Sequence, residues 1–211
     1  MEVRSFTVGP LAENAYLFRR EGSDRALLVD PGEEAPRLLG AIEQIGVTLD
    51  AILLTHTHFD HVGAVGPVAR ATGAEVWVPE RERAILADIN SFVFPGLGPF
   101  ETWEAERTIA GGERLELAGF DIDVLFTPGH SPGHVTFSIP DERVVFSGDV
   151  LFEGSVGRTD LPGGDWATLL ESIRGLVDGL PGETVVYPGH MGVTSLGAER
   201  ASNPFLVELA R

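Results

Sequence analysis

The alternation of apolar and polar positions predicts an ordered series of strands and helices in the first half of the chain. Segments rich in β-branched or aromatic residues and bounded by turn formers are typical of strands. We expect strands at Val3–Val8, Asn14–Arg19, Arg25–Asp30, Ala51–Thr55 and Glu75–Val78. A helical pattern covers Glu34–Ile45, where Gly46 can end the helix, and a second helix is expected from about His61 to Thr72.

The second half of the chain repeats this order of elements. We expect strands at Phe120–Phe126, Val135–Ile139, Arg143–Ser147 and Thr184–Tyr187. Helices are expected at Trp166–Val177 and after Ser202. Because each half places strands before a helix and a further strand, we predict an α/β fold of two facing sheets with helices outside. A chain of 211 residues, 43% of them hydrophobic, fits one such globular domain.

The segment Asp88–Glu106 joins the two halves and contains the turn-forming pairs Pro95-Gly96 and Gly98-Pro99. Irregular connections of this length are usually functional or mobile, so we expect this one near a binding cleft. Its aromatic side chains are expected chiefly to pack against the core, because aromatic residues mainly serve burial. They are Phe92, Phe94, Phe100 and Trp103.

Composition excludes several kinds of chemistry. The chain has no cysteine, and all 15 of its basic residues are arginine. Disulfides, thiolate ligands, a cysteine nucleophile, a P-loop lysine and a lysine Schiff base are therefore excluded. The formal charge of −17 repels phosphate backbones, so we expect no nucleic-acid partner. An anionic substrate would need a strong local positive centre, which is a first indication of a metal ion.

Targeting signals are not apparent in the sequence. No apolar run approaches the roughly 18 residues that a membrane span requires. The first residues lack the basic region and apolar block of a secretory signal. We therefore expect no membrane partner and a cytoplasmic location.

The sequence THTHFDH at positions 55–61 concentrates four metal-binding side chains. The spacing of His56, His58, Asp60 and His61 suits a turn that leaves a strand, because alternation aims His56 and His58 the same way. Asp60 also stands at a plausible N-cap position of the following helix. A helix cap with chance histidines is the alternative, but three of the six histidines fall inside this short stretch.

Three further candidates each follow a predicted strand: His130, Asp149 and His190. Ligands often gather on loops at one end of a sheet, so we expect these side chains to join the first cluster. Five imidazoles and two carboxylates without sulfur favour two divalent metal ions, with zinc first and iron or manganese as alternatives. Such a pair can supply a hydroxide nucleophile near neutral pH. A serine triad is disfavoured, because the G-x-S-x-G match at 129–133, GHSPG, joins two expected strands and does not lead from a strand into a helix.

These motifs, in this order, resemble the metallo-β-lactamase superfamily: THTHFDH, the PGH at 128–130, Asp149 within FSGD and the PGH at 188–190. The resemblance covers nearly the whole chain and implies an αββα sandwich. It implies that His56, His58 and His130 bind one metal, that Asp60, His61 and His190 bind the other, and that Asp149 bridges them. Asp30, in LLVDPG, would support the metal loop without binding metal.

Within the superfamily, the stretch FEGSVGR at 152–158 and the aspartate at 149 resemble the short, bacterial glyoxalase II-like group. This resemblance implies hydrolysis of a small-molecule thioester such as an S-lactoyl thiol. Asp60 would orient the metal-bound hydroxide, and Arg158 would contact the thiol carrier, although an ordinary surface arginine is the alternative. The C-terminal helical extension of the long glyoxalase II would be absent.

Other functions remain open at this point. Gly157 to Asp160 also resemble persulfide dioxygenases, in which one iron is held by counterparts of His56, His130 and Asp149. β-Lactamases of the common types carry cysteine or serine at the position of Asp149, and superfamily phosphodiesterases that act on RNA need basic patches. Both are therefore less favoured, as is a metal-binding protein without catalysis, because the ligand set is complete.

The tripeptide PGH occurs twice in TPGHSPGH, at positions 127–134. Seven ligands complete the site with His130 and without His134. His134 opens the following strand, where alternation groups it with Thr136 and Ser138. We therefore expect His134 to orient a ligand without binding metal. A hydrogen-bonded histidine with a purely structural role is the alternative.

Overall fold

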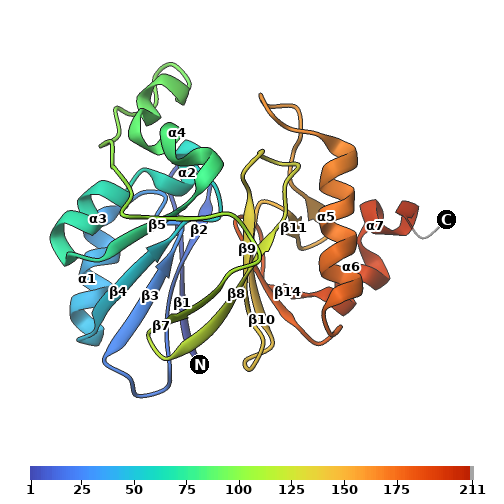
Figure 1. Ribbon diagram of the computed structural model, residues 1–211, viewed down its shortest axis with the longest axis horizontal. Helices are drawn as coiled ribbons and strands as arrows, with labels where there is room; N and C mark the ends of the chain where they lie inside the picture. The colour runs from blue at the N-terminus through green and yellow to red at the C-terminus, as the bar shows by residue number, and fades with distance from the viewer. Residues whose placement is uncertain (210–211) are drawn as a thin grey trace.

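Two six-stranded mixed sheets face each other in the computed structural model, which describes residues 1–209 and side chains as far as Leu206 (Figure 1). The first sheet has the order β1-β2-β3-β4-β5-β6, and its last four strands are parallel. Its strands are β1 Glu2–Val8, β2 Glu13–Arg19, β3 Arg25–Val29, β4 Thr48–Leu53, β5 Glu75–Pro79 and β6 Arg107–Ile109.

The second sheet has the order β14-β13-β10-β9-β8-β7 and is antiparallel except between β10 and β13. Its strands are β7 Arg114–Leu117, β8 Phe120–Phe126, β9 Val135–Ile139, β10 Val144–Gly148, β13 Val185–Pro188 and β14 Thr194–Ser195. A small hairpin of β11 Leu151–Phe152 and β12 Ser155–Val156 follows β10.

Helices cover the outer face of each sheet. In Figure 1, α1 and α3 lie outside the first sheet, and α5 and α6 lie outside the second. The α-helices are α1 Ala35–Ile45, α2 Phe59–Val62, α3 Val65–Thr72, α4 Arg83–Ala87, α5 Trp166–Gly179, α6 Leu196–Ser202 and α7 Pro204–Leu209. Two 3₁₀ turns are η1 Glu80–Glu82 and η2 Ile89–Phe92. No helix among residues 1–209 is long and apolar enough to cross a membrane.

Alternation along the buried strands produces the layers. In β2, Tyr16 and Phe18 pack between the sheets, whereas Ala15 and Leu17 face the helices of the first half. Phe18 stacks on Phe146 of the second sheet with ring centroids 4.7 Å apart, which ties the two sheets together. A third apolar cluster lies between the second sheet and α5. These layers confirm the predicted αββα sandwich.

The helix predicted over His61–Thr72 is interrupted. The structure has the short α2 and then α3, with Gly63 and Ala64 between them. The amide of Ala64 donates to Pro31 O at 2.9 Å, and a β-carbon at Gly63 would overlap Gly32 O. The backbone turns away from a single helix because it packs directly against the loop after β3.

Several other boundaries differ from the sequence-based expectations. The strand β4 begins at Thr48, three residues before the predicted start, and β6 and β7 were not predicted. The final helical region begins with α6 at Leu196 and not after Ser202, and it is divided by Asn203. The strands β6 and β7 are short edge strands with few apolar residues, so the periodicity there is weak.

The connection Asp88–Glu106 is irregular after η2, as predicted. Phe100 and Trp103 are partly buried against the helical side of the first sheet, which agrees with a packing role. Phe92 and Phe94 are 57% and 53% exposed, so the packing prediction is wrong for these two. They lie on a segment whose chain direction is set by turns, so neighbouring aromatic residues point to different surroundings.

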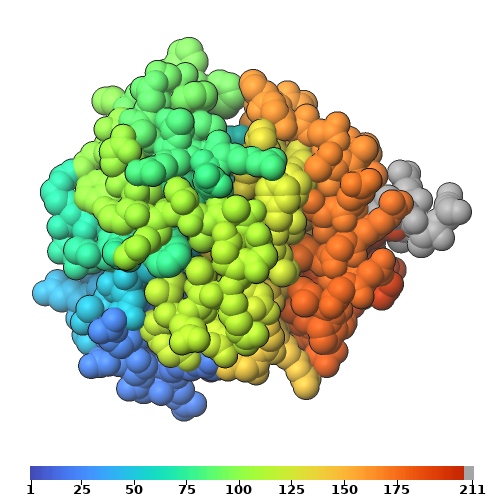
Figure 2. Space-filling model, viewed as in Figure 1, coloured from blue at the N-terminus to red at the C-terminus, as the bar shows by residue number. Residues whose placement is uncertain are grey.

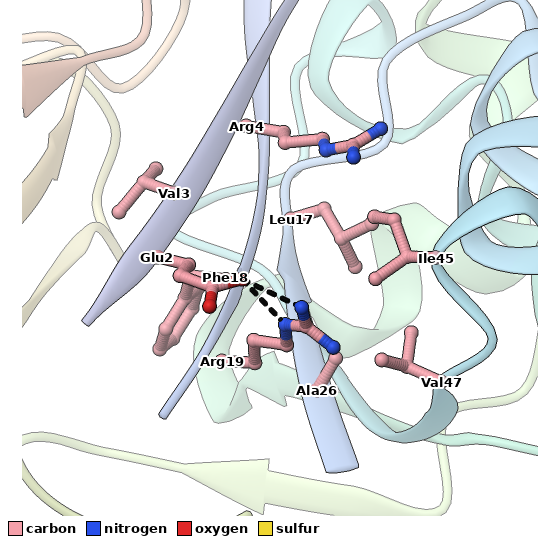
Figure 3. Close-up of a pocket in the computed structure, with 9 residues that line it drawn as sticks. All are labelled: Glu2, Val3, Arg4, Leu17, Phe18, Arg19, Ala26, Ile45 and Val47. Atoms are coloured by element: carbon pink, nitrogen blue, oxygen red, sulfur yellow. Dashed lines mark hydrogen bonds and ion pairs between the residues drawn. The ribbon is translucent and has the colours of Figure 1, made fainter. Parts of the chain in front are cut away.

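The arrangement of the strands brings distant loops to one edge of the sandwich, uppermost in Figure 1. The parallel strands β3 and β4 end there, and so do β10 and β13. Figure 2 shows a notch at this edge between the segment containing α4 and the segment that precedes α5. A separate groove of about 300 Å³ lies at the opposite edge, where β1, β2, β3 and the end of α1 meet (Figure 3).

Candidate metal centre

All seven side chains predicted as metal ligands converge at the upper edge. His56, His58, Asp60 and His61 lie in and before α2, in the connection that leaves β4. The other three follow strands of the second sheet: His130 follows β8, Asp149 follows β10, and His190 follows β13. The cluster therefore joins loops from both sheets.

His56, His58 and His130 form one part of the cluster, called here the three-histidine half. Nδ1 of His58 and Nε2 of His130 lie 2.8 Å apart. The His56 ring centroid is 4.7 Å from that of His58 and 4.8 Å from that of His130. The three side chains each offer one ligand atom within a space suited to one ion.

Asp60, His61 and His190 form the other part, called here the mixed half. Oδ2 of Asp60 lies 3.3 Å from Nε2 of His190 and 3.8 Å from Nε2 of His61. These three side chains also offer ligand atoms close enough for one ion. The mixed half contains a carboxylate, whereas the three-histidine half does not.

Asp149 lies between the two halves. Its Oδ1 is 3.4 Å from Nε2 of His61, and its Oδ2 is 3.4 Å from Nε2 of His130 and 3.6 Å from Nε2 of His190. The carboxylate therefore contacts residues of both halves at once. A β-carbon at Gly189 would overlap Asp149 Oδ1, so the close approach of the PGH loop requires glycine.

Hydrogen bonds fix the orientation of three of the imidazoles. Nδ1 of His130 donates to Arg158 O at 2.8 Å, and Nδ1 of His61 lies 3.1 Å from Asp30 Oδ2. The Thr55 hydroxyl donates to Asp30 at 2.6 Å and so accepts from Nδ1 of His56 at 3.0 Å. With Nδ1 engaged, Nε2 of each ring is directed at the cluster, as in histidine metal ligands generally.

The donor atoms fit divalent ions. Nε2 of His56, Nε2 of His61 and Oδ1 of Asp149 are buried and have no hydrogen-bond partner among the described residues. Buried polar atoms are nearly always paired, so three unpaired atoms in one cluster indicate a missing partner. Imidazole nitrogens with carboxylate oxygens suit zinc, iron and similar ions.

Burial and charge act differently on the histidines of the two halves. Burial lowers the pKa of His56 well below its ordinary value and lowers the pKa of His58 to about 4. Burial also opposes the charge on His61, but Asp149 and Asp60 raise the pKa of His61 well above the ordinary value. The pKa of His190 is raised too, because the hydrogen bond that it donates to Asp60 and the negative charge of Asp149 together outweigh burial.

The carboxylates of the cluster remain ionised. Burial opposes this, but the nearby imidazoles, His61 foremost, hold the pKa of Asp149 and that of Asp60 below the ordinary value. The predicted N-cap role of Asp60 is wrong. His58 occupies the N-cap position of α2, and Asp60 lies inside the helix with its side chain toward His190.

Asp30 supports the metal loop from outside the cluster. Its Oδ1 accepts from the amide of Thr55 at 2.8 Å, and its Oδ2 contacts both the Thr55 hydroxyl and Nδ1 of His61. The side chain thereby joins the end of β3 to both ends of the THTHFDH segment. A supporting role without metal binding stays a prediction for Asp30, because Asp30, His56 and His61 also offer ligand atoms close enough for one ion.

His134 is fully buried beside the cluster and contacts Asp149 through the backbone. The amide of Asp149 donates to Nε2 of His134 at 3.1 Å, so Nδ1 carries the ring proton and faces the Thr127 hydroxyl at 3.0 Å. Burial lowers the pKa of His134 well below its ordinary value, which keeps the ring neutral. Because Nε2 already accepts a hydrogen bond, it has no lone pair left for a metal.

The backbone carbonyl of Arg158 accepts the hydrogen bond from His130, while its guanidinium faces solvent. The side chain makes two hydrogen bonds to Asp160, at 2.6 and 2.7 Å, and is 59% exposed. This ion pair raises the pKa of Arg158. Binding of a thiol carrier by the guanidinium stays a prediction.

Other polar residues of the site were not predicted to have a role. The Asn14 amide donates to Pro188 O and Met191 O at 3.2 and 2.9 Å, and the Tyr16 hydroxyl donates to Pro188 O at 2.6 Å. These bonds from β2 hold the loop that carries His190. Glu13 lies 3.7 Å from Nδ1 of His61, and burial raises its pKa well above the ordinary value. The signal available in the sequence was the pair of polar residues, Glu13 and Asn14, at the start of an otherwise apolar strand.

Comparison with known proteins identifies the family. The family model for the metallo-beta-lactamase superfamily matches residues 8–190, and the chain belongs to this superfamily of metal-dependent hydrolases. The chain is 41% identical to the probable metallo-hydrolase YqgX of Bacillus subtilis, over 98% of each chain. It is 39% identical to the hydroxyacylglutathione hydrolase GloC of Haemophilus influenzae, again over 98% of each chain.

Solved structures agree with this assignment. The BLEG-1 B3 metallo-β-lactamase is 38% identical with a TM-score of 0.92, covering 97% of this chain and 99% of that one. TTHA1623 in a di-iron-bound form is 44% identical with a TM-score of 0.80, covering 97% and 100%. ETHE1 from Myxococcus xanthus is 28% identical with a TM-score of 0.80, covering 99% and 85%.

Proposed function

We propose that the protein is a thioester hydrolase of the glyoxalase II-like type, acting on a hydroxyacyl thioester of a small thiol. The observation that carries the proposal is the position of Asp149, whose two oxygens face both halves of the cluster. β-Lactamases of the common types would have cysteine or serine here. The likeness to hydroxyacylglutathione hydrolase GloC over nearly the full length supports the same substrate class.

The chain's own residues divide the work of such a reaction. The three-histidine half would hold one divalent ion and the mixed half a second, with Asp149 shared between them. When bound, the two ions supply positive charge and lower the pKa of water to near neutrality. Asp60 is partly exposed, so its carboxylate can hydrogen-bond the attacking water and orient it toward the thioester carbonyl.

The leaving group suits a thioester, whereas the charge of the protein requires a local positive centre. A thiol has a pKa near ~8.5, so the departing thiolate needs little protonation and no additional strong acid in the site. The net charge of −17 would repel an anionic thiol carrier. Bound divalent ions would offset this repulsion locally.

Two other reactions have specific support and belong in the same test. The likeness to ETHE1 and the GRTD sequence at 157–160 favour a persulfide dioxygenase that uses a single iron. The likeness to BLEG-1 favours β-lactam hydrolysis. An aspartate at position 149 fits the dioxygenase as well as the hydrolase, so the ligand list alone does not separate these two reactions.

The proposal is tested on purified protein whose metal content has been measured. A lactoyl thioester is supplied without oxygen, a persulfide is supplied in air, and a β-lactam is supplied under both conditions. We expect thioester hydrolysis without oxygen, with two metal ions per chain. Oxygen consumption with the persulfide and no thioester hydrolysis would establish the dioxygenase, and turnover of the β-lactam alone would establish the lactamase.

A further inference from the structure

Glu82 connects two of the loops that carry metal ligands. It lies at the end of η1, which follows β5, and only 2% of its surface is exposed. One oxygen, Oε2, accepts from the amide of Thr57 at 2.6 Å and from the Thr57 hydroxyl at 3.0 Å. The other, Oε1, accepts from the amide of Gly133 at 2.9 Å and from the Ser131 hydroxyl. Each oxygen thus serves one loop.

Both loops belong to the three-histidine half. Thr57 stands between His56 and His58, and Ser131 follows His130 directly. Glu82 makes no hydrogen bond to Asp60, His61 or His190 among those formed by the described residues. Its contacts therefore bear on one half of the cluster and leave the other to different partners.

The chemistry of the contacts requires a carboxylate of this length. Four donors converge on two oxygens, and both oxygens must accept. A glutamine would turn its NH₂ group toward one of the two loops and leave that loop's backbone amide without an acceptor. Gly133 fits closely as well, because a β-carbon there would lie 2.6 Å from Glu82 Cγ.

Arg81, which precedes Glu82 in η1, also contacts the loop that carries His130. Arg81 lies over the Phe126 ring at 4.9 Å and donates to Pro132 O at 3.4 Å. These contacts are exposed, so they contribute less than the buried carboxylate. Two residues of η1, Arg81 and Glu82, therefore contact the TPGHSPGH loop.

We propose that Glu82 is a positioning residue that sets the spacing of the His56–His58 segment relative to His130, and so the metal affinity of the three-histidine half. The inference rests on the proposed metal centre but not on the thioester substrate. Hydrogen-bond partners outside the ligand set typically change metal affinity by about 10–100-fold when removed. Loss of Glu82 should therefore weaken the three-histidine half by about that factor and spare the mixed half.

The experiment measures zinc affinity with a chromophoric chelator, using the full chain made metal-free. Glu82→Ala is placed in two backgrounds. In His190→Ala, which damages the mixed half, Glu82→Ala should weaken the remaining site by about 10–100-fold. In His130→Ala, which damages the three-histidine half, Glu82→Ala should leave the remaining affinity unchanged.

Two further variants keep the side-chain volume nearly unchanged and serve as the test if Glu82→Ala does not fold. Glu82→Gln retains one acceptor oxygen, and Thr57→Val removes one hydroxyl donor while keeping the amide. Both should weaken the three-histidine half, by less than Glu82→Ala does. Glu199→Gln is the matched control, because Glu199 is equally buried and accepts from Gly154 N, Thr194 Oγ1 and Asn203 Nδ2, none of which lies on a loop of the three-histidine half. It should lower the melting temperature and leave zinc affinity unchanged.

A purely structural role for Glu82 gives a different result. Lower thermal stability with unchanged zinc affinity in the His190→Ala background would overturn the inference, as would equal weakening in both backgrounds. Failure of the wild-type protein to hydrolyse thioesters would overturn the proposed function and leave the zinc result standing. The two conclusions can therefore fail separately.

Discussion

The two halves of the metal centre use the same imidazole chemistry in opposite electrostatic surroundings. His56 and His58 are kept neutral by burial, which lowers their pKa values. His61 and His190 lie against Asp149 and Asp60, and these carboxylates raise their pKa values despite burial. Without metal, the mixed half balances its own charges, whereas His56 and His58 present unprotonated nitrogens.

The hydrogen-bond partners that hold the histidines from outside the cluster also differ between the two halves. Nδ1 of His61 is held by a side chain, Asp30, while Nδ1 of His130 is held by the backbone carbonyl of Arg158. The three-histidine half additionally depends on Glu82. The comparison shows that one site can combine a half ready for metal with a half that must exchange protons for it.

The largest effect is expected from the residue that both halves share. Asp149→Ala should lose both metal ions and lower the thioester hydrolysis rate by roughly a thousandfold or more, since several kcal/mol of charge stabilisation are removed. Metal analysis and kcat measure this, with Asp121→Ala as a control, because Asp121 is exposed and its ion pair among the described residues is with Arg114. Two retained ions with full activity would contradict the shared position.

The next largest difference is expected between the metal binding of His130→Ala and that of His134→Ala. His130→Ala removes a donor of the three-histidine half and should weaken that half by more than about a hundredfold. His134→Ala should keep both ions bound but lower the free energy of unfolding by about 1–3 kcal/mol, because the buried amide of Asp149 loses its acceptor. Chelator titration and urea unfolding check both, and equal metal loss would refute the distinction.

Acidification should distinguish the halves by proton competition. His61 and His190 have raised pKa values, so they take up protons at a pH above the ordinary ~6.5, and metal affinity of the mixed half falls as the pH decreases through that range. His58 stays neutral down to about pH 4. Dialysis at graded pH with metal analysis should show the mixed half emptying first. Simultaneous release would contradict this order.

The smallest effects should come from the outer partners. Arg158→Ala leaves the carbonyl bound to His130 in place, so metal content should not change. If the guanidinium contacts the thiol carrier, KM rises a few-fold with kcat kept, about 1 kcal/mol of uniform binding.

Asp30→Ala removes side-chain contacts to both Thr55 and His61 and should weaken metal binding in the mixed half. Equal metal content in Asp30→Ala and Arg158→Ala would show that the Asp30 contacts do not affect metal binding.

The sequence was sufficient for the layers and for the ligand cluster because both follow from local pattern. Alternation in β8 reports burial directly, and ligands follow strand ends. Glu82 was not predicted, since its importance arises only when β5 brings η1 beside two distant loops. The break at Gly63–Ala64 depends on contact with Pro31, which helical periodicity does not reveal. The solvent-facing pairing of Arg158 with Asp160 lies in the irregular segment 157–160, whose conformation the sequence pattern does not reveal.

The wide spacing of the ligands along the chain has a kinetic consequence. His58 and His130 meet across 72 positions, and Asn14 of β2 holds the His190 loop across 174. Such contacts form late, because long loops must close before they can be made. Metal should therefore act after the folding barrier has been crossed, so that it slows unfolding without speeding refolding. In stopped-flow experiments a chelator should raise the unfolding rate and leave the refolding rate unchanged.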